Sequence, residues 1–140
     1  MELQIKRLHS TGKLPEFAHA TDAGMDLFAD ESKQLAAGQR AVISTGIAIA
    51  VPAGYVGLIW DKSGLATKAG ITMLAGVIDA GYRGEVMVAV LNTSNQSYEV
   101  LSCQKIAQLL IQPIVHPVIH EVTKLPAADR GENGFGSTGL

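Results

Sequence analysis

The sequence predicts an all-β protein. Its apolar runs are short, rich in Val and Ile, and separated by Gly, Pro, Asn and Ser, a pattern that is typical of strands joined by turns. No segment repeats its apolar residues every 3.6 positions over the length of a full helix. Many short strands with frequent turn signals favour a sandwich or a barrel. With 140 residues, the chain is expected to form a single domain.

The predicted strands are segments with an apolar pattern and turn residues at their ends. One short helix is expected at Ser63–Ala69, where Ser63 is the predicted N-cap. The strands are expected at residues 2–8, 24–29, 40–51, 55–60, 85–93, 97–101 and 105–115, with weaker ones at 71–78 and 118–123.

The segment from Glu85 to Leu91 is apolar on both faces once past its first residue. This pattern suits either a strand that is buried on both sides or one that faces a neighbouring subunit. The polar residues 92–97 form a turn cluster, so we expect this strand and residues 97–101 to make a hairpin.

Composition and charge limit the possible partners. Only 17 % of the residues are charged, below the roughly 25 % of an average soluble protein, which favours an oligomer that covers part of the surface. The formal net charge is -2, so the molecule offers no positive field to a nucleic-acid backbone. A nucleic-acid polymer is therefore not expected as a partner, whereas a small phosphorylated ligand remains possible.

The single cysteine, Cys103, fits a reducing compartment and is expected to be a small buried apolar residue rather than a nucleophile. The N-terminal residues have no apolar core of signal-peptide length. No stretch reaches the ~20 apolar residues of a membrane span. A cytoplasmic protein without a membrane partner is the expectation.

The chain changes character near Pro126. Residues 126–140 carry four glycines and one aromatic residue, and such a segment cannot bury enough surface to order itself. We therefore expect a β-barrel domain of residues 1–125 and a flexible C-terminal tail of residues 126–140. Arg, Phe, Ser and Thr set among glycines suit a clamp on an anionic ligand, because glycine lets backbone N–H groups approach anions.

Three familiar motifs are not supported. The tail lacks the lysine and the preceding βα unit of a phosphate-binding P-loop. His116 and His120 have a metal-ligand spacing only on a helix, and Pro117 argues for an extended segment. No serine lies in a G-x-S-x-G sequence, the motif of the nucleophile turn in many serine hydrolases.

Two internal segments suit charged ligands. Residues 23–27 place Asp26 in an apolar strand beside a glycine. Lys62, Ser63 and Gly64 offer a cation, a hydroxyl group and backbone amides at a helix start, which suits a phosphate. Taken singly, both also have an ordinary structural explanation.

Two further segments place polar groups among apolar ones. Asp79 and Tyr82 lie on a glycine-flanked turn within residues 76–85, and Gln108 lies in the apolar strand of residues 105–109. A turn aspartate and a polar strand residue are common structural features, so neither segment is decisive alone.

Together with the tail, these four segments resemble, in order and spacing, the five motifs of the trimeric dUTP diphosphatase family. The resemblance covers residues 22–139 and is most specific at residues 76–85, 106–109 and 130–139. It implies a homotrimer of distorted, jelly-roll-like β-barrels whose active sites are shared between subunits. It also implies Mg²⁺-dependent hydrolysis of dUTP to dUMP and pyrophosphate, which clears dUTP from the nucleotide pool and supplies dUMP for thymidylate synthesis.

The resemblance also implies roles for single residues. Asp79 binds the deoxyribose 3′-hydroxyl and is the general base for water attack on the α-phosphate, and Gln108 helps to hold that water or the α-phosphate. Tyr82 lies on the deoxyribose and excludes a 2′-hydroxyl, while Asp26 supports Mg²⁺ through a water. The implied substrate-binding residues are Lys62, Ser63, Gly64, Leu74, Gly76, Val77, Ile78, Tyr82, Arg130, Phe135, Gly136, Ser137 and Thr138.

Within this set, the backbone of Leu74 to Ile78 reads uracil, where cytosine mismatches the donors and acceptors and the thymine methyl group clashes. Lys62, Ser63 and Gly64 hold the phosphates. In the closing tail, Phe135 stacks on uracil, and Arg130, Ser137 and Thr138 contact the γ-phosphate.

The chain departs from the family pattern at Lys62 and Lys105, which replace arginines, at Gln104, which replaces an acid, and at Leu74, which often is glycine. Lysine keeps the charge but lacks the two-pronged fork of arginine. Two alternatives remain open: an enzyme related to dCTP deaminase, and a non-catalytic member of the fold that binds nucleotide or protein.

Overall fold

A computed structural model describes residues 1–132 of the chain. The predicted site residues Phe135, Gly136, Ser137 and Thr138 therefore lie outside the described residues. The elements are, in order, β1 (Gln4–Arg7), β2 (Met25–Phe28), β3 (Lys33–Leu35), β4 (Arg40–Ala50), β5 (Tyr55–Asp61), α1 (Ser63–Ala69), β6 (Ile71–Leu74), β7 (Val77–Ile78), β8 (Glu85–Asn92), β9 (Tyr98–Val100) and β10 (Lys105–Pro113). The prediction of an all-β protein is confirmed.

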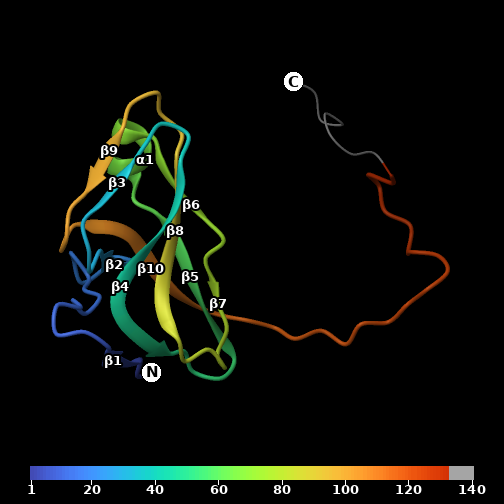
Figure 1. Cartoon of the computed structure of the whole chain (residues 1–140). Helices are drawn as coiled ribbons and strands as arrows, with labels where there is room; N and C mark the ends of the chain where they lie inside the picture. The colour runs from blue at the N-terminus through green and yellow to red at the C-terminus, as the bar shows by residue number, and fades with distance from the viewer. Residues whose placement is uncertain (133–140) are drawn as a thin grey trace.

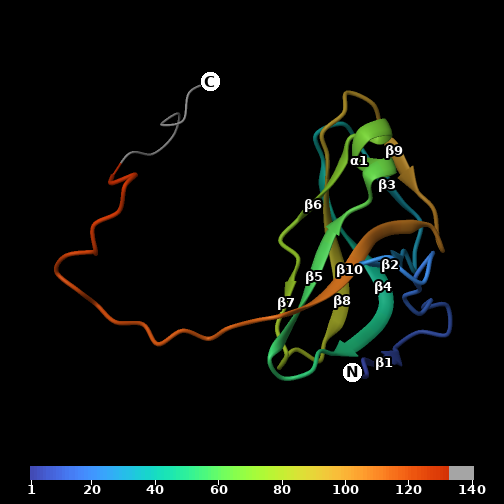
Figure 2. The ribbon, with the colours of Figure 1, turned by 180° about the vertical axis from the view of Figure 1, so that it is seen from behind.

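Two four-stranded antiparallel sheets form the body of the molecule. One has the strand order β1-β4-β8-β6 and the other β2-β10-β5-β7, while β3 and β9 form a small third sheet. Figures 1 and 2 show the barrel from opposite sides, with β4 and β8 in front in the first view and β5 and β10 in front in the second. Buried Ile, Leu and Val side chains from both large sheets fill the space between them.

Strand β8 shows how the core is built. Val86, Val88 and Val90 are buried, whereas Met87 on the opposite face is 41 % exposed. Alternate residues of a strand point to opposite faces, so only one face of β8 enters the core of its own chain. Burial on both sides within one chain is therefore wrong. The alternative, that the second face meets a neighbouring subunit, stays a prediction.

The predicted strand 71–78 is divided into β6 and β7. Ala75 and Gly76 have positive φ angles of 58° and 112°, and they redirect the chain so that β6 pairs with β8 and β7 pairs with β5. A Cβ atom at Gly76 would lie 2.7 Å from the Ile59 carbonyl oxygen. Because backbone occupies that space, only glycine fits where the chain passes from one sheet to the other.

The predicted hairpin between strands β8 and β9 is wrong. Strand β8 pairs with β4 and β6, whereas β9 pairs with β3. Strand β3 was not predicted, because three residues with the sequence Lys-Gln-Leu carry no periodic signal. The pairing of β9 with the distant strand β3 is therefore preferred to a hairpin with β8, although the turn residues between β8 and β9 favour a hairpin.

The helix α1 occupies the predicted residues, but Ser63 is not its N-cap. Lys62 takes the N-cap position with an extended backbone, and no side chain caps the helix. The Ser63 carbonyl instead accepts a hydrogen bond from the Thr67 hydroxyl at 2.7 Å. Within residues 1–132 there is no helix that is long and apolar enough to cross a membrane.

After β10 the chain leaves the barrel as an extended segment (Figures 1 and 2). The predicted strand at 118–123 is wrong, since these residues pair with no strand of their own chain within the described part. Val118 and Ile119 are each 94 % exposed. Cys103 is also exposed rather than buried, because it lies in the tight turn before β10 with a φ angle of 65°.

Candidate active site

The turn between β7 and β8 borders a cavity of about 220 Å³. Five predicted site residues contribute to its wall, together with five residues of β5, β8 and the turn after β6. The lining residues are Ile59, Ala75, Gly76, Val77, Ile78, Asp79, Tyr82, Glu85, Val86 and Met87. Leu74, although predicted to bind substrate, belongs to β6 opposite Ala89 and is not among these lining residues.

Backbone geometry shapes the β6–β7 side of this cavity. The Gly76 carbonyl accepts a hydrogen bond from the Ile59 amide at 2.8 Å, and Ile78 pairs with Gly57 of β5. Val77 is 69 % exposed and points away from the core that holds Ile78. The segment thus offers an apolar edge with a rigid backbone, a suitable surface for a flat heterocycle.

The Asp79 to Gly84 turn places a carboxylate and a phenol on one wall. The Asp79 carbonyl accepts a hydrogen bond from the Tyr82 amide at 3.0 Å, and the Tyr82 hydroxyl donates to the Glu85 carbonyl at 2.8 Å. A Cβ atom at Gly84 would lie 2.5 Å from the Tyr82 hydroxyl oxygen, so glycine makes room for the ring. The Asp79 side chain is exposed and can receive a proton from water.

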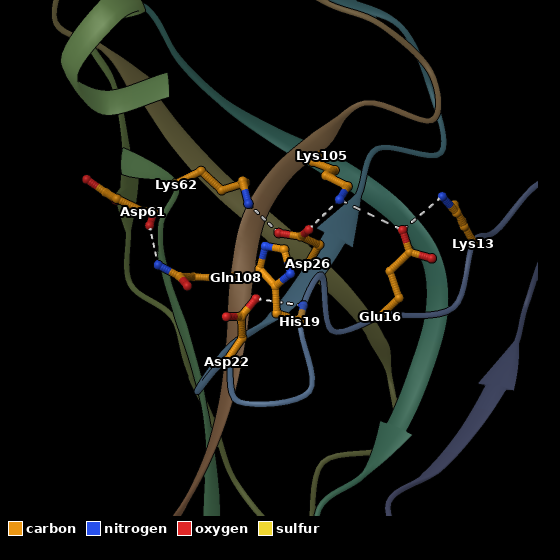
Figure 3. A network of polar contacts seen from close by, with 9 residues as sticks. All are labelled: Lys13, Glu16, His19, Asp22, Asp26, Asp61, Lys62, Lys105 and Gln108. Carbon is orange, nitrogen blue, oxygen red and sulfur yellow. Dashed lines mark hydrogen bonds and ion pairs between the residues drawn. The ribbon is translucent and has the colours of Figure 1, made fainter. Parts of the chain in front are cut away.

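A second polar group is centred on the buried Asp26 of β2 (Figure 3). One carboxylate oxygen pairs with Lys62, and the other lies 2.7 Å from the Lys105 ammonium. Burial alone would raise the pKa of the Asp26 carboxyl, but hydrogen bonds from Lys105 and Lys62 outweigh it and hold that pKa below its usual value. The same carboxylate raises the pKa of Lys105. Asp26 therefore stays ionised and keeps two cations beside β10.

Gln108 lies next to this group on β10 (Figure 3). Its Nε2 donates to the Asp61 carbonyl at 2.8 Å, across the β5–β10 pair. A Cβ atom at Gly24 would lie 2.6 Å from the Gln108 Oε1, so the glycine of the first motif makes room for this amide. The Gln108 side chain can occupy its position only because residue 24, in a separate sequence segment, has no side chain.

Asp61 is a residue that sequence reasoning missed. Its two carboxylate oxygens accept hydrogen bonds from the Thr72 hydroxyl at 2.8 Å and the Met73 amide at 2.7 Å. It joins the end of β5 to β6 and so anchors the residues just before Lys62. A lone acid between a strand and a helix start carries no pattern that reveals such a role.

Ser63 and Gly64 begin α1 directly after Lys62, and both are exposed. A Cβ atom at Gly64 would meet nothing within 4 Å, so the space above its backbone is open to a ligand. Arg130 is exposed and lies in the turn of residues 129–132, where the Gly131 amide donates a hydrogen bond to the Ala128 carbonyl at 2.9 Å.

The Asp79 cavity and the Asp26 group occupy different places on one chain. Ile78 pairs with Gly57, and Lys62 follows Gly57 by five residues, or about 16 Å of extended strand. Gln108 pairs with Trp60 on the far edge of β5 from β7, which adds about 10 Å across the sheet. A general base and a group that holds its water must both reach the same water molecule. One copy of the chain does not bring Asp79 and Gln108 that close.

The side chains of the site also indicate how a metal ion could be held. Within residues 1–132 no three or more His, Cys, Asp and Glu side chains gather as a metal site. Both oxygens of Asp26 already face lysine ammonium groups. Mg²⁺ retains water and is commonly held through substrate phosphates. These residues therefore fit an ion carried by a triphosphate rather than one bound in a protein cage.

Comparison with known proteins identifies the family. Residues 10–139 match the dUTPase family model. Deoxyuridine 5′-triphosphate nucleotidohydrolase of Clostridium tetani is 48 % identical over 139 residues, which cover 98 % of this chain and 96 % of that protein. The chain belongs to the dUTPase family.

Solved dUTPases have the same fold. The Staphylococcus bacteriophage 80alpha dUTPase G164S mutant with dUpNHpp has a TM-score of 0.93 at 33 % identity, with 99 % of each chain covered. The D95N mutant of the dUTPase from phage phi11 of S. aureus, in which a structural Mg(II) ion is coordinated, has a TM-score of 0.85 at 30 % identity over 91 % of this chain and 100 % of that one. The predictions of a dUTP-hydrolysing enzyme and of a jelly-roll-like fold are confirmed.

Proposed function

We propose that this dUTPase hydrolyses dUTP to dUMP and pyrophosphate by attack of water on the α-phosphate, with Asp79 as the general base. The supporting observation is that Asp79, Tyr82 and the β7 backbone line one cavity. An exposed carboxylate on a tight turn can take the proton of water while it holds the 3′-hydroxyl. Gln108, whose amide is oriented by the Asp61 carbonyl, holds the same water.

Uracil binds against the backbone of Gly76, Val77 and Ile78, with Leu74 shaping the approach from β6. The Tyr82 ring lies on the deoxyribose and leaves no room for a 2′-hydroxyl. A site whose polar groups would stay unpaired with cytosine, and whose walls would clash with a thymine methyl group, discriminates strongly.

Lys62, Ser63 and Gly64 bind the phosphates. The carboxylate of Asp26 holds Lys62 in place, and the open space above Gly64 suits close approach of a phosphate to the backbone. The tail of residues 126–140 closes over the nucleotide bound to the barrel of residues 1–125. In the tail, Phe135 stacks on uracil, and Arg130, Gly136, Ser137 and Thr138 contact the γ-phosphate.

Each active site draws on several copies of the chain, assembled as a homotrimer. The separation of Asp79 from Lys62 and Gln108 along β5 supports this arrangement, because the reaction needs these groups around one nucleotide. The extended C-terminal segment supports it as well. Its apolar residues Val115, Val118, Ile119 and Leu125 are at least 78 % exposed in the single chain and gain a buried environment against a second copy.

Mg²⁺ is the proposed cofactor, held through the phosphates of dUTP. When bound, the ion would offset the negative charge of the triphosphate. Asp26, predicted to support the ion through a water, also fixes Lys62 and Lys105 beside the phosphates. The enzyme clears dUTP and supplies dUMP in the cytoplasm, a location that the lone cysteine favours.

One assay tests this function. Pyrophosphate release is measured with dUTP and, as controls, dCTP, dTTP and UTP, each with Mg²⁺ and with a chelator. We expect release from dUTP alone and only with Mg²⁺. Ammonia from dCTP would instead indicate an enzyme related to dCTP deaminase, and binding of a non-hydrolysable dUTP analogue without turnover of dUTP would indicate a non-catalytic member of the fold.

A further inference from the structure

Glu85, the first residue of β8, connects two strands through its side chain. Its Oε1 accepts hydrogen bonds from the Gly46 amide at 2.8 Å and from the Ser44 hydroxyl, both in β4. Hydrogen bonds to an ionised acceptor are roughly twice as strong as neutral ones. We call these two bonds the Glu85 clamp. They tie the start of β8 to β4 more firmly than a backbone pair would.

The clamp lies where the sheet is irregular. The β4–β8 register shifts between Ser44 and Ala48, and Gly46 has a positive φ angle of 66°. Such a bulge interrupts the backbone ladder and leaves donors without strand partners. A Cβ atom at Gly46 would lie 2.8 Å from both the Asp30 carboxyl carbon and the Gly12 Cα, so the bulge has little space to shift. Glu85 is therefore anchored to a rigid part of β4.

The other end of Glu85 belongs to the active-site cavity. Its backbone carbonyl accepts the hydrogen bond from the Tyr82 hydroxyl at 2.8 Å, and Glu85 is one of the residues that line the same cavity as Asp79. The position of the Tyr82 ring thus depends on where the β8 backbone begins. That starting point is in turn held by the clamp on Ser44 and Gly46.

We propose that Glu85 is a positioning residue for sugar selection: by clamping the start of β8 to the β4 bulge, it holds Tyr82 in the place that excludes a 2′-hydroxyl. The inference rests on the proposed function, in which Tyr82 lies on the deoxyribose. Without the clamp, the Tyr82 ring gains freedom to move aside, and a ribonucleotide enters more easily. Glu85 lines the cavity but Ser44 and Gly46 do not, so a change at Ser44 reaches the substrate only through Glu85 and Tyr82.

The test compares kcat and KM for dUTP and UTP in the full-length enzyme. The variants are Glu85→Ala, which removes the clamp, Glu85→Gln, which keeps an acceptor oxygen, and Ser44→Ala, which removes one of the two bonds. Glu99→Ala, an exposed acid on β9, is the matched control. Thermal unfolding verifies that each variant folds.

We expect Glu85→Ala to lower the ratio of kcat/KM for dUTP over UTP about tenfold, the size that follows from losing a hydrogen bond to a charged group. Most of the change should lie in KM rather than kcat. Ser44→Ala should lower the ratio less, while Glu85→Gln should stay within about threefold of wild type because its oxygen still accepts both bonds. Glu99→Ala should leave the ratio unchanged.

A double-mutant cycle adds a readout that a general loss of stability would not give. Tyr82→Phe removes the hydroxyl that contacts Glu85, so Glu85→Ala should change the ratio much less in the Tyr82→Phe background. If the effects of Glu85→Ala and Tyr82→Phe on the ratio of kcat/KM for dUTP over UTP are additive, the inference is wrong. It is also wrong if both Glu85→Ala and Ser44→Ala keep the wild-type ratio. If Glu85→Ala does not fold, Ser44→Ala carries the test, with Glu85→Gln as the variant that should keep the wild-type ratio.

Tyr82→Ala separates failure of the inference from failure of the function on which it rests. If Tyr82→Ala relaxes the selection against UTP and the clamp variants do not, Glu85 has no positioning role and the proposed function stands. If Tyr82→Ala keeps the wild-type ratio, the sugar role of Tyr82 is itself wrong.

Discussion

The Asp26 carboxylate on β2 lies 2.7 Å from the Lys105 ammonium on β10, and its other oxygen pairs with Lys62, which directly follows β5. One buried acid thus links β2 to β10 and to the residue that follows β5, and its single negative charge lies between two cations. The geometry makes Asp26 important for both stability and phosphate binding.

Asp26→Asn should destabilise the fold by about 1–3 kcal/mol, the usual cost of leaving partners of a charged hydrogen bond unpaired. Because the pKa of Asp26 is lowered in the folded state, its contribution is present above the ordinary aspartate range and is lost as pH falls through the folded pKa. The free energy of unfolding of wild type should therefore fall more steeply below about pH 4 than that of Asp26→Asn. Denaturant titrations at several pH values measure this, with the exposed Asp129→Asn as control. Parallel pH curves for wild type and Asp26→Asn would contradict it.

Gly76→Ala should destabilise the protein by about 2–4 kcal/mol and weaken nucleotide binding, since a positive φ angle and a backbone clash combine there. The matched control is Gly38→Ala, which has a positive φ angle of 71° but nothing within 4 Å of the added Cβ atom. Its cost should be about 1 kcal/mol, that of the left-handed backbone alone. Urea midpoints of the two variants give the comparison. Equal losses of unfolding free energy in the two variants would show that the contact with the Ile59 carbonyl does not destabilise Gly76→Ala.

Asp79→Asn should leave the fold intact and nearly abolish turnover. The amide keeps the size of the carboxylate but is a far poorer proton acceptor, so the base is lost rather than a packing group. Steady-state rates for dUTP and the thermal unfolding midpoint are the measurements. More than about a tenth of the wild-type kcat would conflict with the usual size of general-base effects.

A mixing experiment tests whether Asp79 and the tail reach each site from different chains. Asp79→Asn and a chain truncated before Arg130, each inactive alone, are refolded together so that the assemblies form at random. A site then draws an intact Asp79 from one chain and an intact tail from another with a combined probability of about a quarter.

If both parts came from one chain, no site in the mixture could hold both, because every chain lacks one of them. A mixture as inactive as its components, despite verified subunit exchange, would rule out the shared site. Refolded wild-type chain is the control for recovery of activity.

Several features of this protein follow from its sequence alone. Short Val- and Ile-rich runs between turn residues are sufficient to predict strands such as β4, β5 and β10, because apolar pattern and turn chemistry are local properties. The sequence predicts the helix α1 at its observed bounds for the same reason. The glycine-flanked segment around Asp79 and Tyr82 was likewise visible as a candidate site.

Other features were decided by tertiary structure. The pairing of β9 with β3 instead of β8, the break at Ala75 and Gly76, and the exposure of Cys103 depend on contacts between residues far apart in the chain. The hydrogen bonds of Asp61 and the Glu85 clamp reach across strands and leave no local signal.

Long-range strand pairing also separates the Asp79 cavity from the group around Asp26 and Gln108. The sequence indicates which residue types are available for chemistry, since motif and spacing are read along the chain. Their distances depend on sheet order and register: β7 and β10 lie on opposite sides of β5, so Asp79 and Gln108 remain apart in one copy. Long-range strand pairing, which no short window of sequence encodes, therefore decides what a single chain can bring together.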